Sequence, residues 1–77
     1  MKYLDGQTVL VGDQVDLGGG MVGVVVCSFD EGLFAPDFPE AEWGEAKTGV
    51  MVRSEQAGLI HYAEPNVDLV LLQRALH

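Results

Sequence analysis

The sequence predicts a small all-β domain, a closed or half-closed barrel of about five antiparallel strands with one long loop. Three observations favour this fold class. The chain has 77 residues, which is enough for a single domain spanning 1–77. Four segments have the β-branched or alternating pattern of strands, and glycine-rich turns separate them. Closing such short strands into a barrel removes exposed sheet edges.

Strand patterns recur along most of the chain. The four clearest strands are residues 14–17, 21–29, 49–54 and 58–63. The first alternates, with Val15 and Leu17 expected on the inner face. The second is apolar on both faces, as in a central strand that is covered on each side. The short connection SEQAG joins the last two strands and predicts a hairpin turn.

The two remaining segments are less regular. Residues 67–76 fit a strand or a helix, and a closing strand to about Leu72 with a helical turn after it is the favoured interpretation. Residues 30–48 form a connection that is long for a hairpin loop, which indicates a functional or partly structured segment. Pro39, with EAEW after it, predicts one helical turn there.

The glycines Gly18, Gly20 and Gly23 have the spacing of a dinucleotide-binding fingerprint. That fingerprint needs a helix after the glycines, because the helix N-terminus holds the pyrophosphate. The residues after Gly23 are VVVCSF, which is a strand pattern, and the chain is too short for a doubly wound sheet. We therefore expect a glycine-rich hairpin turn at 18–20, a bulge or close backbone approach at Gly23, and no nucleotide cofactor.

Residues 11–26, VGDQVDLGGGMVGVVV, resemble the start of SH3-like barrels of the KOW type. In those modules a Gly-Asp-x-Val strand leads through a glycine-containing turn into a strand that reads Gly-x-Val-Val. The matching residues are Gly12, Asp13, Val15, Gly20, Gly23, Val25 and Val26. The resemblance covers about a fifth of the chain and implies an SH3-like barrel. The wider layout of the chain resembles a group of short bacterial proteins, which implies no particular activity.

KOW-type modules usually contact RNA or proteins of the ribosome and of transcription. The resemblance therefore implies an accessory role in translation or transcription. The chain departs from those modules because its net charge is −8, with twelve acids and four scattered bases. Nucleic-acid binders usually carry a basic patch that neutralises phosphates. The composition thus disfavours nucleic acid as a partner and favours a basic protein, since an acidic surface steers cations inward.

Composition also bears on the compartment. The longest apolar stretch has seven residues, 21–27, whereas a transmembrane helix needs about 20. The N-terminal residues carry charge and glycine where a signal peptide is apolar, so no membrane association is expected. Cys27 is the single cysteine and lies in a valine run, which predicts a buried, inert thiol. The cytoplasm is the simplest compartment for such a chain.

Catalytic patterns are sparse, so we expect no enzyme, no catalytic residues and no cofactor. The two histidines are His61, within a strand pattern, and His77. A pair of Cys27 and His61 across the sheet would also need an exposed cleft and an orienting group. The acids of residues 30–45 lack the regular ligand spacing of a calcium loop, so no metal site is expected.

The surface of residues 30–45 is the best candidate site. It holds six acids and no base, and three aromatic residues alternate with the acids. Interfaces favour aromatic anchors, and opposite charge accelerates encounter with a basic partner. The predicted partner-binding residues are Asp30, Glu31, Phe34, Asp37, Phe38, Glu40, Glu42, Trp43 and Glu45. Trp43 is also the natural cap for the core of so small a barrel, and both roles remain open.

These patterns together predict a non-enzymatic protein-binding module. One concrete form is an immunity or antitoxin-type inhibitor, because small acidic cytosolic proteins that block nucleases use this electrostatics. The alternative is a KOW-like accessory of the translation or transcription machinery. The oligomeric state is left open by the sequence.

Overall fold

The computed structural model describes residues 1–39 and 48–75, and this part of the chain contains strands and no helix. The strands are β1 (Gln14–Gly18), β2 (Met21–Ser28), β3 (Leu33–Phe34), β4 (Val50–Ser54), β5 (Gly58–Tyr62) and β6 (Val70–Gln73). The all-β prediction is confirmed. One strand more than expected is present, because β3 lies in the segment that was predicted to be a loop.

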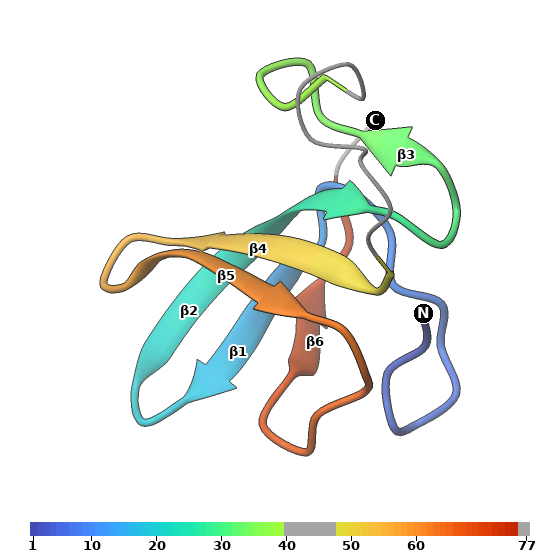
Figure 1. Cartoon of the computed structure of the whole chain (residues 1–77). Helices are drawn as coiled ribbons and strands as arrows, with labels where there is room; N and C mark the ends of the chain where they lie inside the picture. The colour runs from blue at the N-terminus through green and yellow to red at the C-terminus, as the bar shows by residue number, and fades with distance from the viewer. Residues whose placement is uncertain (40–47, 76–77) are drawn as a thin grey trace.

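All six strands belong to one antiparallel sheet in the order β5-β4-β2-β1-β6, and β3 pairs with the end of β2. The sheet curls, so that the β4–β5 hairpin passes across β1 and β6 (Figure 1). Among the described residues, β5 pairs only with β4 and β6 pairs only with β1. The curled sheet is therefore half-closed, and its two edge strands keep one unpaired edge each.

The glycine-rich turn joins β1 and β2, as the sequence predicts. Gly18, Gly19 and Gly20 all have positive φ, between 60° and 83°, which side chains rarely adopt. Gly23 follows within β2, where a Cβ atom would lie 2.6 Å from Cγ1 of Val52 and 2.9 Å from the Arg53 carbonyl oxygen. The fingerprint spacing thus serves a hairpin and a close strand approach, and the segment after Gly23 is a strand.

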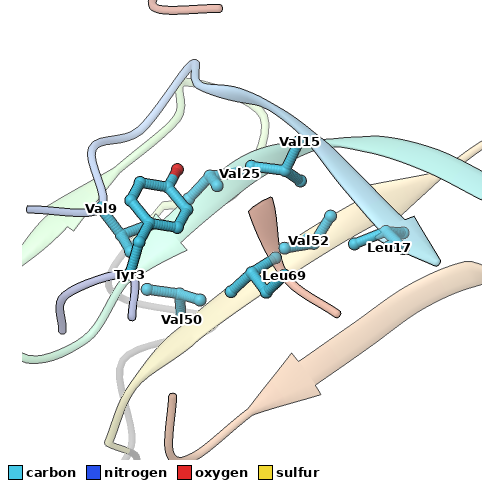
Figure 2. Close-up of a cluster of buried hydrophobic side chains, with 8 residues drawn as sticks. All are labelled: Tyr3, Val9, Val15, Leu17, Val25, Val50, Val52 and Leu69. Carbon is cyan, nitrogen blue, oxygen red and sulfur yellow. The ribbon is translucent and has the colours of Figure 1, made fainter. Parts of the chain in front are cut away.

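The main core lies on the concave face of the sheet. Eight buried side chains meet there: Tyr3, Val9, Val15, Leu17, Val25, Val50, Val52 and Leu69 (Figure 2). They come from the N-terminal segment, from β1, β2 and β4, and from the residue before β6. The alternation predicted for β1 is confirmed, because Val15 and Leu17 are buried while Gln14 is exposed. Burial of these apolar side chains is the main stabilising term of so small a domain.

A bulge lets β2 serve two cores. Val25 pairs with Val52 and Cys27 pairs with Met51, so Val26 is an extra residue on β2. Val25 faces the main core, whereas Val26 and Cys27 pack with Met51 in a second cluster. This confirms coverage on both faces for the second half of β2, from Val25 to Ser28, whereas Val22 in the first half is exposed. The Cys27 thiol is buried, as predicted.

The C-terminal prediction was partly wrong. The closing strand exists, but β6 covers Val70–Gln73 and begins three residues later than expected. Residues 74 and 75 have no regular structure, so the helical turn expected after Leu72 is absent from the described residues. The helical turn predicted after Pro39 lies outside them. No helix that could cross a membrane occurs in the described part of the chain.

Candidate functional site

The described part of the predicted partner-binding surface folds back on the sheet. β3 pairs with β2 through Cys27↔Phe34 and Ser28↔Leu33. The rings of Phe34 and Phe38 are half-buried and pack on the second cluster. These two aromatics therefore cover the sheet, and each keeps part of its ring in contact with solvent.

The acids of this segment remain at the surface. Asp30 and Glu31 are exposed and face the N-terminal ammonium group of Met1, with N–O distances of 3.4 and 3.8 Å. Asp37 is also exposed, beside a hollow of about 270 Å³ that Phe38 helps to line. The segment thus brings three carboxylates and two partly exposed rings to one end of the sheet.

The other predicted members of this surface lie outside the described residues. They are Glu40, Glu42, Trp43 and Glu45. The partner-binding role of the whole segment, and the choice between cap and contact for Trp43, remain predictions.

The buried carboxylate of Asp13 and the network around it were not predicted from the sequence. Asp13 is 1% exposed, and its Oδ2 atom accepts hydrogen bonds from the Tyr3 hydroxyl (2.7 Å), the Leu10 amide (2.9 Å) and the Arg74 guanidinium (2.8 Å). The same Arg74 nitrogen also donates to the Thr8 carbonyl oxygen over 2.7 Å. The network joins the N-terminal segment, the residue before β1 and the residue after β6.

Electrostatics in this network favour a protonated tyrosine beside a charged pair. Burial, and then the hydrogen bond to Asp13, raise the pKa of Tyr3 far above its ordinary value of 10.0. The second oxygen of Asp13, Oδ1, is buried and has no hydrogen-bond partner among the described residues. Arg74 is close enough to balance the carboxylate charge. The arrangement is suited to fixing chain segments rather than to proton transfer.

His61 and Cys27 do not form a thiol–imidazole pair. Met51 lies between them in the sheet, because it pairs with Cys27 on one side and with His61 on the other. Nε2 of His61 donates to the Thr48 carbonyl oxygen over 2.7 Å, and its ring packs edge-on against Phe29 at 5.6 Å. His61 therefore holds the start of β4 in place, as a structural strand residue would.

No group of three metal-ligating side chains comes together in the described residues. No protein-family model matches the chain, and the comparisons with curated proteins and with solved structures found no match. The candidate site is therefore defined by its own surface chemistry.

Proposed function

We propose that this protein is a non-enzymatic binding module that recognises a basic partner protein. The supporting observation is the sign of the exposed charge. In the described chain seven acids are exposed: Asp5, Asp30, Glu31, Asp37, Glu55, Glu64 and Asp68. The exposed bases in the same part are two, Lys2 and Arg53. Such a field accelerates encounter with cations and repels nucleic acid.

The ion pair of Arg74 with Asp13 leaves this imbalance unchanged, because its two charges cancel. The Arg74 guanidinium is directed at the buried Asp13 carboxylate and at the Thr8 carbonyl oxygen, so its charge is balanced within the fold. The pair therefore contributes little to the outer field. The exposed carboxylates of residues 30–37 lie beside partly exposed aromatic rings, which is the combination of steering charge and apolar anchor that interfaces use.

An immunity or antitoxin-type inhibitor is the concrete form of this function. Proteins that bind nucleic acid carry basic surfaces, so an acidic module can cover such a surface and exclude its substrate. We propose the cytoplasm as its compartment, since the sequence has a single cysteine, which is buried and forms no disulfide within the chain.

The KOW-like accessory role is the alternative. The residues that carry that resemblance have structural roles. Val15 and Val25 are in the main core, and Asp13 accepts the hydrogen bonds of the buried network. Gly23 permits the close approach of β4 to β2. They support the fold and supply no basic surface for RNA. We therefore rank the alternative second.

Affinity capture from a nuclease-treated lysate of the native host tests the proposal. The tagged protein is loaded at low salt and eluted with a salt gradient, and eluted proteins are identified by mass spectrometry. We expect to capture a basic protein even after nuclease treatment. A variant with Asp30, Glu31 and Asp37 changed to Lys should no longer capture it. Capture of ribosomal or transcription proteins only when RNA is intact would contradict the proposal and support the alternative.

A further inference from the structure

The edge strand β6 carries an unusual combination of features. Within the described residues it pairs with β1 on one side and with no strand on the other. Its four residues, VLLQ, contain no charge and no proline. Natural proteins usually protect sheet edges with charged residues, proline or a covering segment, because an unpaired edge offers hydrogen bonds to another chain. The edge of β6 lacks charge and proline and is therefore suited to pairing.

An apolar hollow lies beside this edge. Its volume is about 280 Å³, and the buried Tyr3 and Leu69 contribute to its lining. Three further lining side chains are unusually exposed for their type, with Leu4 at 63%, Val67 at 74% and Val70 at 49%. Grouped exposed apolar side chains of this kind mark interaction sites more often than isolated ones do.

Acids flank the hollow. Asp5 lines it, Asp68 follows Val67 in the chain, and Asp16 pairs with Val70 across β1 and β6. Two hydrogen bonds from Gln7, from its amide and then from its side chain, lower the pKa of Asp5 below its ordinary value of 3.8, so this carboxylate is charged at neutral pH. None of the described residues that line the hollow is basic.

A turn fixes the exposed residues next to β6. Oδ1 of the Asn66 side chain accepts a hydrogen bond from the Asp68 amide (2.8 Å), and the backbone carbonyl oxygen of Asn66 accepts one from the Leu69 amide (3.0 Å). This turn buries Leu69 in the core and leaves Val67 and Asp68 at the surface. The apolar and acidic groups are thereby held ready beside the edge.

We propose that the β6 edge binds an extended basic segment of the partner protein by strand addition, with apolar side chains on Leu4, Val67 and Val70. Lysine or arginine side chains of that segment then meet Asp5, Asp16 and Asp68. Backbone pairing supplies affinity in this mode, and side chains supply specificity. A second copy of the chain is a poor occupant, because pairing two β6 edges would bring the acids of both copies together at a net charge of −8 each.

This inference rests on the proposed function and names a surface for it that is separate from residues 30–45. A synthetic peptide of alternating Lys and Val is the probe, and its binding is followed by amide NMR shifts and by the dissociation constant. We expect shifts at Val70–Gln73, and about tenfold weaker binding to a variant with Asp5→Lys and Asp68→Lys. The matched control, Glu55→Lys with Glu64→Lys, changes two exposed acids that do not line the hollow. It changes the net charge equally and should bind within about twofold of wild type.

Strand pairing is tested on the peptide itself. Methylating alternate backbone amides of the same peptide removes donors and blocks pairing, and we expect binding to be lost. Unchanged binding of the methylated peptide, or equal weakening by both double variants, would overturn strand addition at this edge. The oligomeric state is the last check. If the wild-type protein is a dimer, and the Asp5→Lys, Asp68→Lys variant forms a weaker or a tighter dimer, the occupant of the β6 edge is a second copy and the proposal is overturned.

The two proposals can fail separately. If a captured basic partner binds wild type and the Asp5→Lys, Asp68→Lys variant equally, the β6 edge is not the binding surface. The proposed function then still stands. Absence of any salt-eluted basic protein, together with peptide binding at β6, would remove the proposed function as it stands and leave a peptide-binding edge.

Discussion

The Tyr3 hydroxyl donates a 2.7 Å hydrogen bond to Oδ2 of Asp13, and so ties the N-terminal segment to the residue before β1. Both residues are almost fully buried, with exposed fractions of 4% and 1%. A buried carboxylate is costly unless donors and an opposite charge surround it. The Tyr3 hydroxyl and the Leu10 amide donate hydrogen bonds to Asp13, and Arg74 supplies both a donor and the opposite charge. The network therefore holds both ends of the described chain against the sheet.

Removing the Arg74 guanidinium should lower the stability of the fold, because the buried Asp13 carboxylate would lose its opposite charge. We expect Arg74→Met to lower the free energy of unfolding by about 2 kcal/mol. The loss is smaller than for a fully buried pair, because the Arg74 side chain is 38% exposed. Arg53→Met, at an exposed position, removes the same charge and should cost less than about 0.5 kcal/mol. Urea unfolding of both variants makes the comparison, and equal losses would refute a special role for the network.

The buried tyrosine predicts a loss of stability at alkaline pH. Burial and the bond to Asp13 raise the pKa of Tyr3 in the fold, while an unfolded tyrosine releases its proton near 10.0. Above that pH the folded state binds more protons than the unfolded state, so the free energy of unfolding falls as pH rises. Tyr3→Phe should cost about 1 kcal/mol at neutral pH, through the lost hydrogen bond, and should show a shallower alkaline decline.

Unfolding measured across the alkaline range checks this sign. Burial, followed by the charge of Asp68, also raises the pKa of Tyr62, so part of the decline should remain in the Tyr3→Phe variant. An unchanged slope in that variant would show that Tyr3 is not held in its protonated form by the fold.

Gly23 should tolerate no side chain. A Cβ atom there would approach Cγ1 of Val52 to 2.6 Å and the Arg53 carbonyl oxygen to 2.9 Å, so strands β2 and β4 would have to separate. We expect Gly23→Ala to destabilise the fold by about 2 kcal/mol, as overpacking does. Gly19→Asn is the control, since a Cβ at Gly19 meets nothing within 4 Å and asparagine tolerates its φ of 60°. Thermal unfolding of both variants tests this explanation. A Gly19→Asn variant as destabilised as Gly23→Ala would contradict the steric explanation.

Much of the fold could be predicted from local patterns. The β-branched run of β2 and the alternation of β1 identify strands, and the glycines at 18–20 identify the turn between them. β3 was missed because two residues have no periodicity. The bulge at Val26 was missed because it depends on pairing with β4, which the sequence of β2 does not reveal.

The site was less predictable, because its groups meet only through the fold. Asp13 and Arg74 are 61 residues apart in sequence, and nothing local marks either as half of a buried pair. The apolar hollow at β6 likewise combines Leu4 with Val67 and Val70 from the other end of the chain. A run of acids such as that of residues 30–45 is visible in sequence, whereas such long-range groups need the sheet topology.

The roles of Trp43 and its neighbouring acids can be separated by kinetics. If Trp43 is a contact residue, Trp43→Ala should raise the dissociation rate of the basic partner by an amount that corresponds to about 2 kcal/mol. Changing Glu40 and Glu42 to Lys should slow association and leave dissociation less affected. A lower melting temperature of Trp43→Ala with unchanged partner kinetics would instead identify Trp43 as a core cap. Both quantities are measured on the same variants.

The salt dependence of association tests recognition of a basic partner most directly. Raising the salt from about 0.1 M to about 1 M shortens the Debye length from about 10 Å to about 3 Å. If the exposed acids steer a cationic protein, the association rate constant of the captured partner should fall by about tenfold or more over this range, while its dissociation rate constant changes far less. An association rate that does not depend on salt would contradict the account.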